Sequence, residues 1–494
     1  MSVKKELIGG FAYTAIAKYM GVVISFIITA VLSRLLLPDD FGIVAIATVL
    51  INFFSLLSDM GVGPAIVQNK SLDKADYSHI FSLTVWIGII LAVLFFVLSP
   101  FISTYYKNDQ LLIICRLLSV NIMFVTWNIV PNALLYKNKM FKYLAYRNLV
   151  VQFIGGSLAV TGALYGLGIY ALLVNPIFTS VVMFFISFAK HPQKMRFSLQ
   201  FASIKKIQSF SIYQFLFNLV NYLSRNLDKL VIGRVLGERS LGYYEKSYRM
   251  MMLPLENITF VINPVMLPVF SEFQHDLNRL VTSYMKVVRT LAFIGSALTL
   301  LLFFAARELI LLIFGMQWEP SVDVFRILSL SVGIQIVLST AGSIFQAADS
   351  TKIMFYNSLV TVCINMTGLF IGIFFFGTIE AVAYAILIAF TINFFVTYYT
   401  LFRYTFCDVK SLLYFFRQLV SPFCLCLIIA SILMFLIGMQ MYPIFQNEYI
   451  NLIFGLLFKS LIILTGTVLY IQLTKEYDIW NKIKMFITKK NKKK

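Results

Sequence analysis

Nine ionisable side chains interrupt the long apolar runs of this chain or stand at their ends. If those runs cross a membrane, each charge within them costs roughly 2.5–3.5 kcal/mol, so it should face a protein interior or an aqueous cavity. Cations in such a place can hold an anionic ligand, whereas acids can take up protons or ions. The candidate substrate-binding residues are Lys18, Arg116, Arg225 and Arg249. The candidate coupling or gating residues are Asp59, Asp228, Glu256, Arg34 and Arg234.

Several of these charges have a purely structural alternative. Arg225 and Asp228 are three residues apart, so they share a helix face and can neutralise each other. Asp59 can be a helix-boundary residue. Two further charges within apolar runs, Arg326 and Lys459, can extend to a headgroup region.

No residue pattern points to covalent catalysis or to a metal. The histidines are His79, His191 and His275, far apart in the sequence, and the five cysteines have no metal-binding spacing. The sequence also lacks a phosphate-binding glycine loop followed by lysine and Ser/Thr. We therefore expect no catalytic residue, no metal and no cofactor, and we predict that the protein is not an enzyme.

The composition is that of a polytopic membrane protein. Of 494 residues, 60% are hydrophobic and 13% are charged, and the mean hydropathy is +0.84. Soluble domains are about half apolar and a quarter charged. The net charge is +19, but the cations lie mainly in short loops and in the C-terminal tail, which argues against nucleic-acid binding.

Apolar runs of about 20 residues, the length of a spanning helix, predict an all-α fold with about fourteen transmembrane helices. We expect two pseudo-symmetric six-helix lobes and a C-terminal helix pair. The domains are then an N-lobe over 1–200, a C-lobe over 201–405, and the last pair with a basic tail over 406–494. The predicted spans are 10–33, 41–66, 80–103, 111–135, 145–166, 168–189, 208–232, 241–270, 287–314, 324–347, 355–376, 379–402, 419–440 and 450–473.

The loop charges predict the orientation. With the N-terminus inside, 28 lysines and arginines, Arg147 among them, fall in inside segments and 8 in outside segments. Cytoplasmic loops carry this excess of cations, so both termini should be cytoplasmic. The lysine-rich end at 489–494 should contact anionic membrane lipids.

A short polar turn occurs twice, at an offset of 200 residues. Residues 33–42 read SRLLLPDDFG and residues 233–242 read GRVLGERSLG. Arg34 aligns with Arg234 and Gly42 with Gly242 under this offset. A repeat this long indicates a duplicated lobe rather than a solenoid, and duplicated lobes of transporters enclose a shared cavity.

The segments around these turns resemble a known family. They are LSRLLLPDDFG (32–42), LSDMGVG (57–63), NLDKLVIGR (226–234) and LGYYEKSYR (241–249), which runs on to LPLEN (253–257). They are similar to bacterial polysaccharide transporters: the O-antigen, capsule and exopolysaccharide flippases of the multidrug/oligosaccharidyl-lipid/polysaccharide exporter superfamily.

The resemblance implies two six-helix lobes around a central cavity, alternating access, and a lipid-diphosphate-linked oligosaccharide as cargo. Related lipid II flippases use basic cavity residues on helices one, two and eight. Lys18 and Arg249 lie on the first and eighth predicted helices, whereas the second carries Asp59 instead of a base.

We therefore expect a flippase for cell-surface polysaccharide biosynthesis, with a polysaccharide polymerase and glycosyltransferases as candidate partners. One alternative is an ion-coupled multidrug or metabolite antiporter of the same superfamily, which the excess of cations within the spans disfavours. The other is a non-transporting membrane scaffold for envelope glycan assembly.

Overall fold

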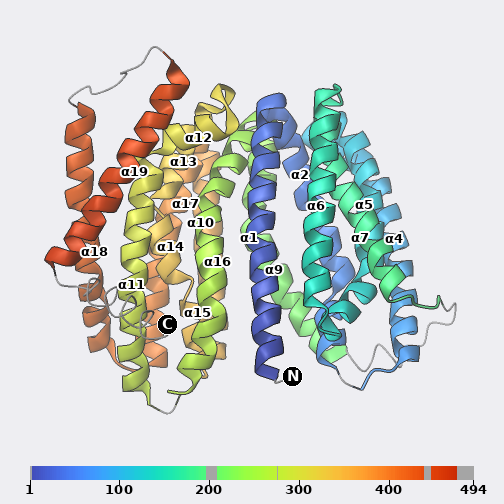
Figure 1. Cartoon of the computed structure of the whole chain (residues 1–494), viewed down its shortest axis with the longest axis horizontal. Helices are drawn as coiled ribbons and strands as arrows, with labels where there is room; N and C mark the ends of the chain where they lie inside the picture. The colour runs from blue at the N-terminus through green and yellow to red at the C-terminus, as the bar shows by residue number, and fades with distance from the viewer. Residues whose placement is uncertain (1–2, 70, 196–207, 275, 439–446, 475–494) are drawn as a thin grey trace, which may run out of the picture. The chain divides into compact units, whose positions relative to one another are not determined.

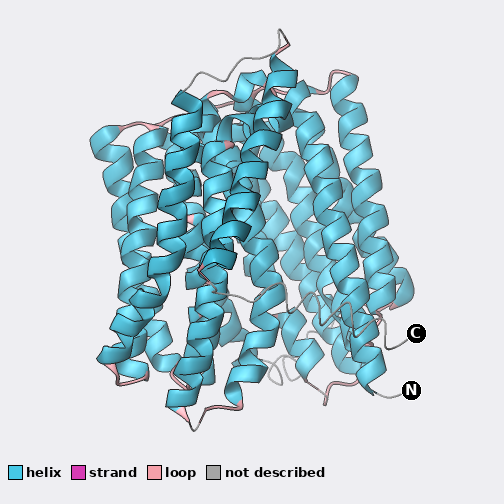
Figure 2. Ribbon diagram, turned by 60° about the vertical axis from the view of Figure 1, so that its left-hand side comes forward, coloured by secondary structure: helices cyan, strands magenta, loops and turns pink. Residues whose placement is uncertain are grey.

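The computed structural model describes residues 3–69, 71–195, 208–274, 276–438 and 447–474. These residues form helices and connecting loops, and no strand occurs among them (Figures 1 and 2). The predicted all-helical class is confirmed. The chain divides into two compact units, Met1–Glu245 and Lys246–Lys494, each of which is described by itself below.

The first unit is a set of long helices that pack side by side. α4 packs on α5, α5 on α7, α7 on α6, and α6 on α1. A core cluster at α4, α5 and α7 contains Phe81, Val130 and Phe184. The helical segments are α1 (Val3–Leu35), α2 (Pro38–Asp59), α3 (Val62–Gln68), α4 (Lys74–Tyr106), α5 (Gln110–Lys137), α6 (Phe141–Leu164), the short turn η1 (Gly168–Tyr170), α7 (Ala171–Lys190), α9 (Gln208–Val235) and the start of α10 (Glu238–Ser271).

The second unit is built around α11, which packs on α14, α18 and α19. Its core joins Phe293 and Leu300 of α11 to Leu425 of α18 and Ile463 of α19, so the C-terminal helix pair is part of this unit's core. The segments after α10 are α11 (Leu277–Phe304), α12 (Ala306–Phe314), η2 (Met316–Trp318), α13 (Pro320–Ser329), α14 (Val332–Leu338), α15 (Ala341–Ala347), α16 (Thr351–Ile371), η3 (Gly372–Phe376), α17 (Ile379–Thr400), η4 (Leu401–Thr405), α18 (Val409–Gly438) and α19 (Glu448–Leu473).

The predicted number of spans is not confirmed. Among the described residues, 11 helices are long and apolar enough to cross a membrane. The number is up to 12 if the bent pair Pro320–Ser329 and Val332–Ala347 is one span. Fourteen spans are predicted, and the two that do not meet this criterion correspond to α6 and α9. Both helices carry several polar residues, such as Asn148 and Gln152 in α6, which lower their apolarity.

The second predicted span, 41–66, is interrupted in the structure. α2 ends at Asp59, and the backbone turns through the left-handed region at Met60 (φ 41°) and Gly61 (φ 74°) before α3 begins. Glycine adopts this conformation without steric cost. The break leaves Asp59 at a helix end, where its Oδ1 accepts a hydrogen bond from the backbone N–H of Gly63 (3.2 Å).

The two copies of the repeated turn pack against each other within the first unit. A Cβ atom on Gly42 would lie 1.8 Å from the carbonyl oxygen of Glu238, and one on Gly242 would lie 2.1 Å from the carbonyl oxygen of Pro38. Pro38 and Glu238 are themselves equivalent under the 200-residue offset, so the contact is reciprocal, like a two-fold interface between identical surfaces. Only glycine permits this approach of backbone to backbone.

We therefore expect Gly42→Ala and Gly242→Ala each to destabilise the protein by about 1–3 kcal/mol or more, because the opposing atoms are backbone and cannot rotate away. Thermal unfolding of the purified protein in detergent measures this. Gly342→Ala is the control, because a Cβ there meets nothing within 4 Å. Equal melting temperatures for Gly42→Ala and Gly342→Ala would contradict the close contact of the turns.

Candidate functional site

The first unit contains a partly open cavity of about 1110 Å³, lined by residues of α2, α3, α5, α6 and α7. Most of the surface of its wall is apolar, and carboxamide and hydroxyl groups are set among the apolar side chains. The carboxamides are those of Asn52, Gln68, Asn121, Asn128, Asn132, Asn148, Gln152 and Asn175. The hydroxyls are those of Thr48, Ser55, Tyr136, Thr179 and Ser180.

Helical periodicity brings these groups to one place. On α5, Asn121, Asn128 and Asn132 recur at i, i+7 and i+11, which lie on one helix face. Residues four apart do the same on α6, at Asn148 and Gln152. On α2 and α7 the corresponding stripes are Thr48, Asn52, Ser55 and Asp59, and Asn175 and Thr179.

Arg147 of α6 orients two of the carboxamides from behind. Its side chain is buried, and its guanidinium donates to Oδ1 of Asn132 (3.0 Å), Oδ1 of Asn148 (3.0 and 3.2 Å) and Oγ of Ser187 (2.6 Å). A guanidinium only donates, so the amide oxygens of both asparagines must face it. Their NH₂ groups, which make no hydrogen bond among the described residues, remain available as donors.

Two other carboxamides of the wall bind the protein through their NH₂ groups. Asn121 donates through Nδ2 to the carbonyl of Pro176 (2.8 Å), and Gln152 donates through Nε2 to the carbonyl of Gly21 (2.9 Å). These two side chains therefore keep their oxygens as acceptors. The Oδ1 atom of Asn128 is buried and has no hydrogen-bond partner in the described structure.

The cavity wall is close to neutral. Among its described residues, Asp59 is the one carboxylate and no lysine, arginine or histidine is present. Of the nine sequence-predicted site residues, Asp59 therefore lines this cavity and the others do not. The predicted basic residues lie elsewhere.

Lys18 and Arg116 lie outside the cavity wall of the first unit. Lys18 is partly buried on α1. Arg116 is exposed on α5, and its guanidinium lies 4.8 Å from the ring centroid of Phe96, a cation–π contact. Arg116 precedes Asn121 by five residues, and at 3.6 residues per turn this places it about 140° around α5 from the cavity face.

The predicted residues on α9 make no hydrogen bond or ion pair with one another in the described structure. Arg225 is exposed, whereas Asp228 accepts hydrogen bonds from the hydroxyl of Tyr244 (2.7 Å) and the backbone N–H of Lys229 (2.8 Å). Arg234 at the end of this helix stacks on Tyr105 of α4, 5.0 Å from the ring centroid. Asp228 and Arg234 thus make packing contacts within the first unit, and their coupling or gating role stays a prediction.

The remaining predicted residues stand at helix surfaces. Arg34 is exposed at the end of α1 in the first unit. In the second unit, Arg249 and Glu256 are exposed on α10, seven residues and therefore two turns apart. They share one face of that helix.

Sequence reasoning missed the carboxamides because it followed only ionisable groups. The sequence does show neutral polar residues at i, i+4 and i+7 spacing inside apolar runs, and this spacing could have predicted a polar helix face. The prediction counts Arg147 with the cytoplasmic loop charges, and the structure places it near the start of α6, where it is buried beside the cavity wall. A buried guanidinium requires several acceptors, and Asn132, Asn148 and Ser187 supply them.

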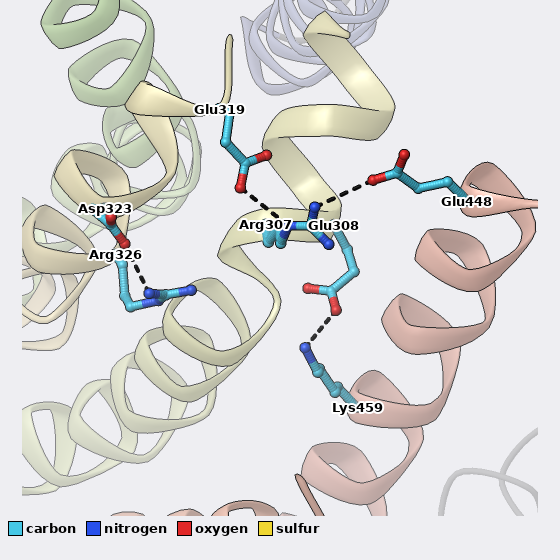
Figure 3. A network of polar contacts seen from close by, with 7 residues as sticks. All are labelled: Arg307, Glu308, Glu319, Asp323, Arg326, Glu448 and Lys459. Atoms are coloured by element: carbon cyan, nitrogen blue, oxygen red, sulfur yellow. Dashed lines mark hydrogen bonds and ion pairs between the residues drawn. The ribbon is translucent and has the colours of Figure 1, made fainter. Parts of the chain in front are cut away.

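A buried ion pair in the second unit gives Lys459 a structural role (Figure 3). Its Nζ lies 2.5 Å from Oε1 of Glu308 and donates to the carbonyl of Phe304 (2.8 Å), with side-chain exposures of 12% for Lys459 and 11% for Glu308. Gly455 leaves the space for this carboxylate, since a Cβ there would lie 3.0 Å from Oε1. Lys459 therefore joins α19 to α12 rather than extending to the headgroups.

Neighbouring ion pairs in Figure 3 are more exposed. Arg307 contacts Glu319 (3.1 Å) and Glu448 (3.2 Å), and Arg326 contacts Asp323 (2.8 Å). Pairs of this exposure contribute about 0–1 kcal/mol each. The Glu308–Lys459 pair is thus the stronger link between α12 and α19.

The long apolar helices define a helical multi-pass membrane protein. A polysaccharide biosynthesis protein family matches residues 31–323, a stretch that includes both copies of the turn. This chain belongs to that family, and the expected family is confirmed.

Individual proteins agree with this assignment. An uncharacterized membrane protein in the cps region of Klebsiella pneumoniae is 26% identical over 408 residues, 82% of this chain and 84% of that protein. The lipopolysaccharide biosynthesis protein WzxC of Escherichia coli (strain K12) is 24% identical over 376 residues, 75% of this chain and 76% of that protein.

A solved structure has the same fold. The lipid II flippase MurJ, in an inward closed conformation, matches with a TM-score of 0.72 and 16% identity, over 93% of this chain and 98% of that one. At this identity the likeness shows the fold alone.

We expect Lys459→Met to destabilise the protein by about 3–5 kcal/mol, because it leaves the Glu308 carboxylate buried without its partner. The double variant Glu308→Gln/Lys459→Met should recover most of that loss. Unfolding in detergent measures both, with Arg326→Met at an exposed pair as control. A Lys459→Met protein no less stable than Arg326→Met would exclude this role for the pair.

Proposed function

We propose that this protein moves a lipid-diphosphate-linked oligosaccharide from the inner to the outer leaflet of the bacterial inner membrane, for the synthesis of O-antigen, capsule or exopolysaccharide. The observation that carries the proposal is the family match over residues 31–323. The match covers both copies of the turn, so it extends over most of the predicted N-lobe and the first part of the predicted C-lobe. Transport would proceed by alternating access, with no covalent step.

The cations within the predicted spans support an anionic cargo. A diphosphate is held best by charge-assisted hydrogen bonds in a site of low dielectric constant. The proposed ligands are Lys18, Arg116, Arg225 and Arg249. Asp59, Asp228, Glu256, Arg34 and Arg234 are the proposed coupling or gating residues.

The positive-inside charge pattern supports cytoplasmic positions for both termini. The basic tail would then bind anionic lipids of the inner leaflet. The polysaccharide polymerase and the glycosyltransferases that act on the same lipid-linked intermediate are the proposed protein partners.

One observation favours a second candidate, the ion-coupled antiporter. Asp59 lies in the wall of a cavity whose described residues include no cation, and a lone acid there could take up a proton or a cation. Efflux of a cationic dye by the purified protein, driven by a proton gradient and lost in Asp59→Asn, would support this candidate.

Replacing Lys18 and Arg116 together by alanine should slow translocation at least about tenfold. A hydrogen bond to a charged group contributes roughly 1.5–3 kcal/mol, and 1.4 kcal/mol corresponds to a factor of ten. The assay is leaflet-resolved translocation of a lipid-diphosphate-linked oligosaccharide in proteoliposomes. The control, Lys352→Ala/Arg403→Ala, also removes two cations, both exposed. Wild-type rates in the Lys18/Arg116 variant would overturn this assignment of the diphosphate ligands.

A further inference from the structure

The cavity of the first unit offers hydrogen-bond donors and acceptors side by side. The NH₂ groups of Asn132 and Asn148 are available because Arg147 holds their oxygens. The oxygens of Asn121 and Gln152 are available because their NH₂ groups are bound to backbone carbonyls. In each of these carboxamides, either the oxygen or the NH₂ group binds the protein, and the other group is available to a ligand.

This pattern matches a particular ligand chemistry. A hydroxyl group has one donor and two acceptor positions, so a ligand rich in hydroxyls is matched by a wall with both. A phosphate is held best by cations, which the described wall lacks, and a cationic drug would use the carboxylate of Asp59 but few of the carboxamides. An alkyl chain would leave the carboxamides without partners, which is unfavourable for groups removed from water.

We propose that this cavity is the saccharide subsite of the transporter. It binds uncharged, hydroxyl-rich sugar residues of the cargo, while the diphosphate is held by cations outside the cavity wall. The inference rests on the proposed function and adds to it the part of the cargo that this cavity recognises. The volume of about 1110 Å³ exceeds that of common small-molecule sites, roughly 300–1,000 Å³, and so leaves room for an oligosaccharide.

Asn128 is the residue we assign to sugar selection. It lies on the α5 face between Asn121 and Asn132, and its Oδ1 is buried without a partner. Rotation of the Asn128 carboxamide would turn this oxygen into the cavity, where a sugar hydroxyl could donate to it and complete its hydrogen bonding. Sites that bind a substrate hydroxyl in this way discriminate strongly against ligands that lack it.

The test compares two probes on the full-length protein in lipid nanodiscs. One is undecaprenyl diphosphate bearing a neutral oligosaccharide, and the other is undecaprenyl diphosphate alone. The variants are Asn128→Leu and Asn52→Leu. The second is at an exposed position of the cavity wall, so we expect this variant to fold like the wild type, and its melting temperature checks this. Thr161→Val, which removes an exposed hydroxyl of α6 outside the cavity wall, is the control.

We expect the wild-type protein and Thr161→Val to bind the glycosylated probe more tightly than the bare one. Asn128→Leu should lose about tenfold in affinity for the glycosylated probe and Asn52→Leu several-fold, with binding of the bare diphosphate unchanged in both. Equal weakening of both probes, or no weakening of either, would overturn the saccharide subsite while leaving the proposed function in place. If the wild-type protein binds neither probe, the proposed function fails and the subsite with it.

Discussion

A lipid bilayer provides no hydrogen-bond partner for a polar side chain within its apolar core, and this constraint organises the first unit. Four long helices, α2, α5, α6 and α7, each carry a stripe of neutral polar residues. The stripes can avoid lipid only if they face one another, and the four helices bring them to the wall of one cavity. The buried guanidinium of Arg147 also needs hydrogen-bond partners inside the protein, and Asn132, Asn148 and Ser187 accept from it. The cavity is thus a consequence of how the polar residues are spaced.

A second constraint comes from the repeated turn. Gly42 and Gly242 each lie against backbone of the opposite copy. Oδ2 of Asp39 lies 3.9 Å from Nε of Arg239, and these two residues are also equivalent under the 200-residue offset. The duplication therefore retained a contact between its two copies, with glycine where the backbones meet and opposite charges beside it. Such a contact holds the starts of α2 and α10 together within the first unit.

Hydropathy and turn residues predicted the fold well, because burial in a bilayer imposes apolar runs of known length. Each predicted span corresponds to a helix or a broken helix, although α6 and α9 fall short of the apolarity expected of a span. The candidate site was harder to predict. Charges in apolar runs are conspicuous, but Arg116 proved to stack on Phe96 and Lys459 to pair with Glu308. The carboxamides form a site only through tertiary packing, which the sequence of one helix does not reveal.

The proposed function depends most directly on the identity of the cargo. The deciding measurement is leaflet-resolved transport by the purified wild-type protein in proteoliposomes, with a lipid-diphosphate-linked oligosaccharide and a cationic dye offered in parallel. The account predicts that the glycolipid crosses to the opposite leaflet and that the dye is not moved. Transport of the dye without movement of the glycolipid would contradict it.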